Sequence, residues 1–446
     1  MLYDKQFWKS TLFLALPIAL QSLLSSSFSF VDLLMIGTLG DDTIAAIGLA
    51  GQISFLQGVF LFGACSGGMI FISQYWGAGN TDGIKRTYGM IMLNCVTIGL
   101  LFFLLAFFIP ELCMGFYTDN ENVIRIGADY LKIVSFSYIG SSFIMGFSFV
   151  LRAVERAWIP LITNIISVLT NVFLNYVLIF GNLGFPKLGV RGAAIATIIS
   201  AFINPVLIFV FAYIGKTVLA SKPSEIFAFS RTSFKKYYSI ALPVLINEIL
   251  WSLGMTTYNS IFGHMDNYAA LTISKTVENI VFVLFVGLCN ACAVLIGKYI
   301  GIGKINTAKE YAKRFLLLVP LIGFFAGLAV ILLRKNILGF FSTSEGVRDL
   351  TFILLLIYGL ELGIRNISYI CVVGIFRAGG DTKTGMYYDL FCLWFIGLPA
   401  TFISANFFNI SFAAIFAIML FSEDTIKTIL CLRYFKSMKW IKPVNN

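Results

Sequence analysis

The sequence contains little charge and almost no histidine. Asp, Glu, Lys and Arg make up 12% of its 446 residues, whereas a soluble domain has about a quarter. The single histidine, His264, leaves no cluster of the kind that binds metals or serves in acid–base catalysis. The chain also lacks the ATP-binding motif GxxxxGK[ST]. These absences argue against a soluble protein, an enzyme and an ATP-binding protein.

Apolar residues dominate instead, at 59% of the chain. An apolar run of about 20 residues is long enough to cross a bilayer as a helix. We therefore predict an all-α integral membrane protein with twelve spans and no removable signal peptide. The expected spans are 13–36, 50–75, 88–109, 128–150, 160–180, 192–214, 238–262, 270–297, 315–333, 351–375, 386–405 and 411–431. Cys289-x-x-Cys292 lies in one of them and is read as two buried thiols rather than a redox or metal motif.

The distribution of Lys and Arg predicts the orientation. With the N-terminus in the cytoplasm, 23 of the 32 fall on the inside, seven on the outside, and Lys275 and Arg365 within spans. Inside segments of membrane proteins are enriched in basic residues, so both termini are predicted to be cytoplasmic, in a multi-pass protein of the cell membrane. The same asymmetry explains the net charge of +10 without a nucleic-acid partner.

The two halves of the chain repeat one another. Ala15-Leu16-Pro17 returns as Ala241-Leu242-Pro243, and Tyr75-x-Gly77-x-Gly79 returns as Tyr299-x-Gly301-x-Gly303. Each half has six spans, an even number, so both enter the membrane in the same direction. We therefore predict two six-helix lobes, residues 1–215 and 238–446, joined by a cytoplasmic connector, residues 216–237. A pseudo-two-fold axis along the membrane normal would relate them, with a cavity between them.

Polar residues inside the spans are the candidate functional groups of the first half. Asp32 lies in an apolar span, where a charge is costly and usually functional. Asn164, Asn171 and Asn175 share one stripe of the fifth span, at steps of seven and four. Amide oxygens beside a carboxylate suit Na⁺, or a protonatable Asp. The alternative is that the asparagines hold helices together.

The second half contains more acids within its spans. Glu248, Glu278 and Asp389 are candidates for binding a substrate or an ion. Glu361 and Arg365 are four residues apart, which predicts an ion pair within one helix.

Several stretches together resemble the multidrug and toxic compound extrusion (MATE) family over nearly the whole chain. They are LALPIALQ, FVDLLMIGTLGDDTIAAIGLAGQI, SQYWGAGN, VLRAVERAWIPLITN, NLGFPKLGVRGAAIATIIS, IALPVLINEILWSLGM and FRAGGDTKTGMYYDL. The resemblance implies a secondary antiporter that expels organic, often cationic, compounds against Na⁺ or H⁺ flow. It implies a bacterial type of transporter, without an ATP site, in two six-helix lobes.

The resemblance also assigns roles to residues. Asp32 matches the carboxylate of the family's first-helix cation site, Asn171 and Asn175 its fifth-helix ligands, and Thr197 its sixth-helix hydroxyl, so these four would hold Na⁺ if that is the coupling ion. Some relatives have Asp at the position of Asn175, so this site carries less charge. Glu248 resembles a seventh-helix acid of several branches. A tenth-helix acid of some branches falls near Asn366, and Glu278 or Asp389 would substitute for it.

Other functions make different demands on the sequence. A flippase for a lipid-linked precursor, the alternative we retain, would need a basic central cavity for pyrophosphate, whereas Arg365 is the one clear arginine within a span. A non-transporting scaffold would not need buried acids in both halves. The expected partners are small organic compounds and the lipid bilayer, the protein acts as a monomer, and the only expected cofactor is the coupling ion, Na⁺ or H⁺.

Overall fold

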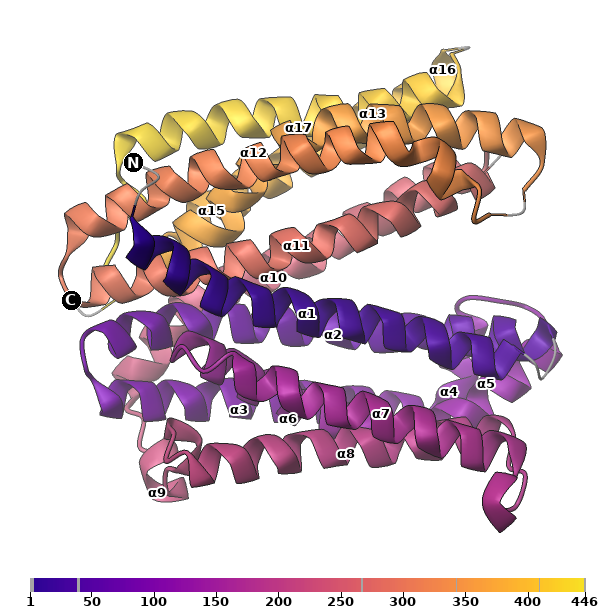
Figure 1. Ribbon diagram of the computed structural model, residues 1–446, viewed down its shortest axis with the longest axis horizontal. Helices are drawn as coiled ribbons and strands as arrows, with labels where there is room; N and C mark the ends of the chain where they lie inside the picture. Colours follow the sequence, from indigo (N-terminus) through magenta and orange to yellow (C-terminus); the bar gives the residue numbers. More distant parts are fainter. Residues whose placement is uncertain (1–3, 38–40, 266–267, 342, 409, 445–446) are drawn as a thin grey trace. The chain divides into compact units, whose positions relative to one another are not determined.

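The computed structural model describes every residue except 1–3, 38–40, 266–267, 342, 409 and 445–446. The side chains of residues 27–34, 36–37 and 41–42 also lie outside the described part. The described chain is helical (Figure 1), which confirms the predicted all-α fold.

The first half of the chain supplies the first six membrane spans. They are α1 (Lys5–Gly37), α2 (Asp41–Gly77), α3 (Thr81–Phe108), the pair α5 (Glu121–Val134) and α6 (Ser137–Ala153), α7 (Trp158–Phe180) and α8 (Val190–Ile214). Short helices α4 (Pro110–Gly115), η1 (Asn182–Gly184), η2 (Val218–Ala220) and α9 (Pro223–Ile226) lie in the connections.

The second half supplies six more spans. They are α10 (Arg231–Gly263), α11 (Tyr268–Gly301), α12 (Ile305–Leu338), α13 (Glu345–Tyr369) continued by η3 (Ile370–Phe376) and α14 (Arg377–Gly379), α15 (Thr382–Phe391) continued by η4 (Cys392–Gly397) and α16 (Leu398–Phe407), and α17 (Phe412–Ser437). In the described chain, ten spans meet a simple test of length and apolarity, and the α5–α6 pair is an eleventh. The twelfth, α17, carries Glu423, Asp424 and Lys427 in its middle.

The fourth span departs from the prediction. Residues 128–150 were expected to form one continuous helix, but α5 and α6 meet at a bend of 54°. The Ser135 hydroxyl donates to the Lys132 carbonyl oxygen at this bend (2.9 Å). A serine bonded to the preceding turn competes with the helical ladder, and an apolar run does not reveal such a break.

The described chain divides into two compact units. Unit 1 comprises Met1–Ala19, Ser73–Gly79 and Ser239–Asn446, and unit 2 comprises Leu20–Ile72 and Asn80–Tyr238. In unit 1, α13 lies beside both α12 and α17, and in unit 2 α7 lies beside α8 (Figure 1). These units follow proximity in space, whereas the predicted lobes, residues 1–215 and 238–446, follow the sequence repeat. The lobe boundaries therefore stay a prediction.

The repeated Tyr-x-Gly-x-Gly motifs meet within unit 1, at the ends of α2 and α11. A Cβ atom on Gly77 would overlap the Lys298 carbonyl oxygen, and a Cβ atom on Gly301 would overlap the Gln74 carbonyl oxygen. The backbones approach this closely because neither glycine has a side chain. The final glycine of each motif, Gly79 or Gly303, has a φ of +67° or +83° and turns the chain out of its helix.

The C-terminal tail is fastened to the same region of unit 1. The Lys442 amide donates to the Gly379 carbonyl oxygen (2.7 Å), and the Val444 amide donates to the Gln74 side chain (2.8 Å). Lys442 also forms an ion pair with Asp381 (2.9 Å). Burial would raise the pKa of Asp381, but hydrogen bonds from Tyr434, Lys442 and Thr384 outweigh it and lower that pKa. Asp381 therefore stays ionised at neutral pH and holds the tail.

Candidate functional sites in the two units

The asparagine stripe of α7 forms the polar interior of unit 2. Asn164, Asn171 and Asn175 are all buried, and the last two have no exposed surface. Asn175 donates to the Asn171 side-chain oxygen (2.7 Å), and Asn171 donates to the Ser200 hydroxyl on α8 (3.2 Å). The predicted stripe therefore faces protein rather than lipid.

Thr197 joins this group through Ser200. The Ser200 hydroxyl donates to the Thr197 carbonyl oxygen (3.0 Å), while the Thr197 hydroxyl donates to the Ala193 carbonyl oxygen (3.0 Å). A carbonyl or hydroxyl oxygen that accepts one hydrogen bond keeps a second lone pair. The hydrogen-bonded series from Asn175 through Asn171 and Ser200 to Thr197 therefore has oxygen atoms that can accept a further hydrogen bond or ligate Na⁺.

Asn164 connects the stripe to α1. Its amide nitrogen donates to the Gln21 carbonyl oxygen and to the Ser25 hydroxyl, each at 3.4 Å. Arg152 from the end of α6 donates to the Gln21 side chain (2.7 Å). These contacts fix the part of α1 that belongs to unit 2 about two to three turns before Asp32, whose side chain lies outside the described residues. The asparagines do join helices, as the alternative interpretation proposed.

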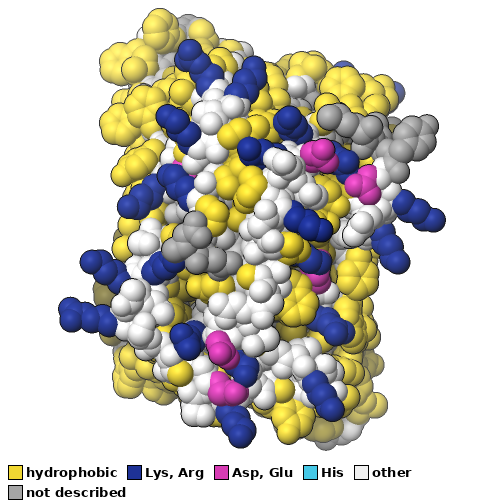
Figure 2. Space-filling view, turned by 90° about the vertical axis from the view of Figure 1, so that its left-hand side faces the viewer, with side chains coloured by type: hydrophobic (Ala, Val, Ile, Leu, Met, Phe, Trp, Pro, Cys, Tyr) yellow, Lys and Arg dark blue, Asp and Glu magenta, His cyan; other side chains and the backbone are white. Residues whose placement is uncertain are grey.

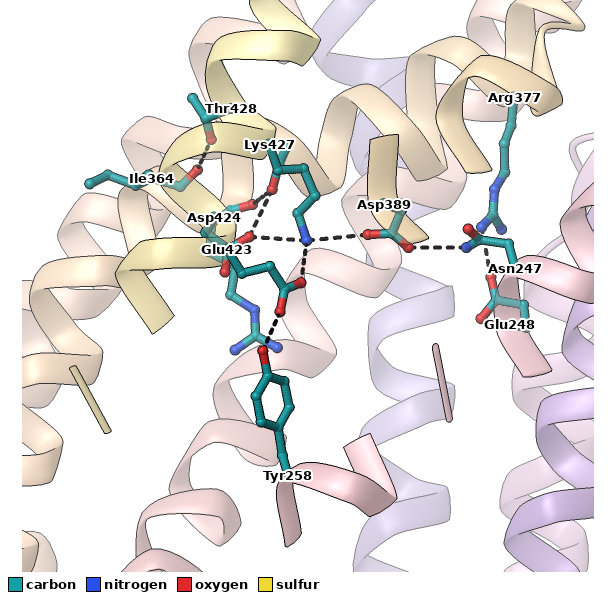
Figure 3. A network of polar contacts seen from close by, with 12 residues as sticks. Asn247, Glu248, Tyr258, Ile364, Arg377, Asp389, Glu423, Asp424, Lys427 and Thr428 are labelled. Atoms are coloured by element: carbon teal, nitrogen blue, oxygen red, sulfur yellow. Dashed lines mark hydrogen bonds and ion pairs between the residues drawn. The ribbon is translucent and has the colours of Figure 1, made fainter. Parts of the chain in front are cut away.

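Lys427 is the centre of the polar interior of unit 1. Its ammonium lies between carboxylates of Asp389 (3.2 Å), Glu423 (2.9 Å) and Asp424 (3.2 Å), as Figure 3 shows. Tyr258 donates to the second oxygen of Glu423 (3.1 Å), and Ser368 donates to Asp424 (3.1 Å). Because Lys427 is only 7% exposed, this charge is satisfied by protein groups rather than by water.

Asp389 and Glu248 continue the network towards α10. The Asn247 amide donates to the second oxygen of Asp389 (3.1 Å), and the neighbouring Glu248 pairs with Arg377 (2.7 Å; Figure 3). Arg377 and Lys427, like Arg152, were assigned from sequence to inside segments, but all three are buried. A basic residue near the end of a span can turn inwards to an acid or amide, as these three do.

Glu278 takes the partner that was predicted for Glu361. Arg365 forms its ion pair with Glu278 of α11, so the predicted pair between Glu361 and Arg365 within α13 is wrong. Lys275, one turn before Glu278, contacts the Asn259 side chain. Each of the acids expected in the second half, Glu248, Glu278 and Asp389, therefore has a basic partner from another helix, and none shares a hydrogen bond or ion pair with another in the described residues.

Glu423, Asp424 and Lys427 were not predicted from sequence to form a functional group. All three stand in the stretch FSEDTIK of the expected span 411–431, and their spacing of three and four residues places them on one helix face. Three charged residues in the middle of an expected span are the sequence signal from which this cluster could have been predicted. The described residues contain no group of three or more His, Cys, Asp or Glu side chains arranged to hold a metal ion.

Replacing Lys427 is expected to destabilise the protein strongly. Lys427→Met removes the one cation shared by three carboxylates, and breaking a buried ion pair costs roughly 3–5 kcal/mol. Thermal unfolding in detergent should show a much lower midpoint for Lys427→Met than for the wild type. Lys436→Met, which removes an exposed lysine of the same helix, is the matched control. Equal midpoints for the two variants would contradict a structural role for the Lys427 cluster.

Comparison with known proteins gives one consistent result. A family model described as MatE matches residues 17–177 and 243–403, so the two matches begin at the two copies of the Ala-Leu-Pro motif. A probable multidrug resistance protein NorM from Thermotoga maritima is 25% identical over 438 residues, which cover 97% of this chain and 93% of that protein. An uncharacterized transporter, YisQ, from Bacillus subtilis is also 25% identical, with 98% and 96% coverage.

Solved structures share the fold. The structure of a mutant of the Vibrio cholerae MATE transporter VcmN superposes with a TM-score of 0.89 at 19% identity and covers 99% of both chains. An outward-facing multidrug resistance MATE family transporter of the MOP superfamily superposes with a TM-score of 0.86 at 16% identity, covering 97% of this chain and 96% of that one.

Proposed function

The chain belongs to the MatE family, and from that membership we propose that it expels organic, often cationic, compounds by antiport against Na⁺ or H⁺. The match of the family model to both halves of the chain carries the proposal. Relatives over nearly the full length are named as multidrug resistance proteins, and the family is one of membrane transporters, not enzymes. The proposed partners are small organic compounds and the bilayer, for a protein that acts as a monomer.

We assign the coupling ion to Asp32 with Asn171, Asn175 and Thr197. The support is that the last three belong to one buried, hydrogen-bonded group on α7 and α8, in the unit that also contains residue 32. Asp32 would supply the charge. The amide and hydroxyl oxygens would complete the coordination shell of Na⁺, or accept a hydrogen bond from a protonated Asp32.

Ion and cargo would compete for this carboxylate. If occupancy by one disfavours the other, inward ion flow drives outward cargo flow without further machinery. Pro17 lies inside α1, and a proline gives a helix a point at which it can bend. Binding of the ion at Asp32 would repack α1 and lower the affinity for cargo, while the site opens to one side of the membrane at a time.

A second set of acids in unit 1 would serve cationic cargo or a second ion. Glu248, Glu278 and Asp389 are the candidates, and each is ion-paired, with Arg377, Arg365 and Lys427 respectively. A cationic compound must therefore displace or share a basic partner to bind there. Binding of a cationic compound at Glu248, Glu278 or Asp389 would therefore rearrange the ion pairs of these acids.

We propose that both termini lie in the cytoplasm of a cell-membrane protein. The face drawn in Figure 2 carries many Lys and Arg side chains and few Asp or Glu, as expected for the cytoplasmic side of a membrane protein. A cysteine introduced near either terminus should then react with a membrane-impermeant thiol reagent only after right-side-out membrane vesicles are opened.

Efflux from liposomes tests the proposed function. Purified protein is reconstituted into vesicles loaded with a fluorescent organic cation, and an inward Na⁺ gradient or an inward H⁺ gradient is imposed. One gradient is expected to accelerate efflux, and that gradient identifies the ion. Vesicles without a gradient are the control. No efflux under either gradient would contradict antiport and favour the flippase, which would then be tested with an anionic lipid-linked cargo.

A further inference from the structure

Glu361 is a buried acid without an ion-pair partner among the described residues. It lies on α13 with none of its surface exposed, and neither carboxylate oxygen accepts a hydrogen bond from any residue that the structure describes. Leaving an ionised carboxylate in this condition is far more costly than leaving a neutral one.

The charged groups around Glu361 come from three helices. Asp424 of α17 faces it within hydrogen-bonding reach. Arg365, one turn further along α13, is engaged by Glu278 of α11. Tyr358 is the other titratable side chain of α13 nearby. The charged residues of α12 stand in its first ten and last five positions, away from its middle, and η3 has none.

The donors of this interior are already committed to other acids. Lys427 serves Asp389, Glu423 and Asp424, while Tyr258 donates to Glu423 and Ser368 to Asp424. Glu361, Glu278, Asp389, Glu423 and Asp424 are thus five carboxyl groups beside three bases, Lys275, Arg365 and Lys427. Full ionisation would leave excess negative charge inside the membrane-spanning part of the protein, which is strongly unfavourable.

We propose that Glu361 binds a proton and donates it in a hydrogen bond to Asp424, so that unit 1 contains a proton-binding site. Two carboxylates are both acceptors, and a bond between them forms only when one carries a proton. The proton belongs to the pair, and placing it on Glu361 leaves Asp424 charged for Lys427. None of Asp32, Asn171, Asn175 and Thr197 takes part, so the inference stands if antiport through Asp32 fails its test.

Release of this proton would have a defined structural consequence. An ionised Glu361 stands four residues from Arg365, the spacing at which acid and base pair along a helix. It would then compete with Glu278 for that guanidinium. The pair expected from sequence is therefore the deprotonated alternative to the observed one, and proton release would free the Glu278 carboxylate.

Infrared spectroscopy of the full-length protein in lipid tests this proposal. A protonated carboxylic acid has a C=O stretching band separate from those of carboxylates and amides. The Asp32→Asn background removes the contribution of that side chain. In this background we expect the band at neutral pH and its loss at strongly alkaline pH. Glu361→Gln should remove the band, whereas Asp424→Asn should shift it by changing the acceptor of the proton.

Glu345→Gln is the matched control, because Glu345 is exposed on the first turn of the same helix. This variant should leave the band unchanged. A band that persists in folded Glu361→Gln protein, or no such band in the Asp32→Asn background, would overturn the proposal. If Glu361→Gln does not fold, Glu361→Asp takes its place, and a band at unaltered frequency there would overturn it equally.

Discussion

Asp32→Asn is expected to abolish gradient-driven efflux while leaving the protein folded. Asn has nearly the same size as Asp but no charge, so the site can neither attract Na⁺ strongly nor bind and release a proton. A loss of about 1.4 kcal/mol in binding free energy already lowers affinity roughly tenfold, and removal of the only carboxylate proposed for this site should exceed it. Initial efflux rates from the loaded liposomes, with and without the effective gradient, measure the change.

Two further variants serve as controls for the Asp32→Asn experiment. Asp119→Asn removes an exposed carboxylate in the same half of the chain and should transport as the wild type does. Asp32→Glu retains a carboxylate and should keep part of the gradient dependence. Undiminished gradient-driven efflux in Asp32→Asn would place coupling instead at the acids of the second half, with Glu248 the first to be tested.

Gly77→Ala and Gly301→Ala are each expected to prevent the chain from reaching its folded state. In both positions a Cβ atom would overlap a backbone carbonyl oxygen, of Lys298 or Gln74. A flexible side chain could move away, but a backbone carbonyl moves only with its helix. The cost should therefore exceed the roughly 1–3 kcal/mol of ordinary overpacking. The yield of monodisperse protein on size-exclusion chromatography and its unfolding midpoint measure the loss.

Gly58→Ala provides the control for this experiment. Gly58 lies on α2 like Gly77, but nothing lies within 4 Å of a Cβ atom placed there. Alanine also favours a helix more than glycine does, so this variant should be as stable as the wild type or slightly more stable. Wild-type stability in Gly77→Ala would mean that α2 and α11 do not meet as closely as the structure shows.

The fold was largely accessible from sequence because its signal is long. Twelve apolar runs and a repeat with six runs per copy need no knowledge of contacts, and the helical class was confirmed. Breaks inside a run leave a weaker signal. The bend between α5 and α6 depends on how the chain around Ser135 bonds to its own backbone, and the run of apolar residues continues across it.

Polar groups that lie on one face of a single helix could be predicted from sequence, whereas ion pairs between different helices could not. The stripe of Asn164, Asn171 and Asn175 follows from helical geometry alone, and all three are buried. The choice that Arg365 makes between Glu361 and Glu278 depends on how α13 is rotated towards α11, which spacing within one helix does not determine. The partners of Lys427 were not predicted for a related reason, since only the positions of α15 and α17 show that it reaches Asp389.

The contact of the two glycine motifs is reciprocal. Gly77 meets Lys298 just as Gly301 meets Gln74, and each residue stands 224 positions from its counterpart in the other copy. In oligomers, an exchange of this kind is the mark of an isologous interface around a two-fold axis. Each glycine makes room for the backbone of the other copy, so a side chain added to either motif would disturb both.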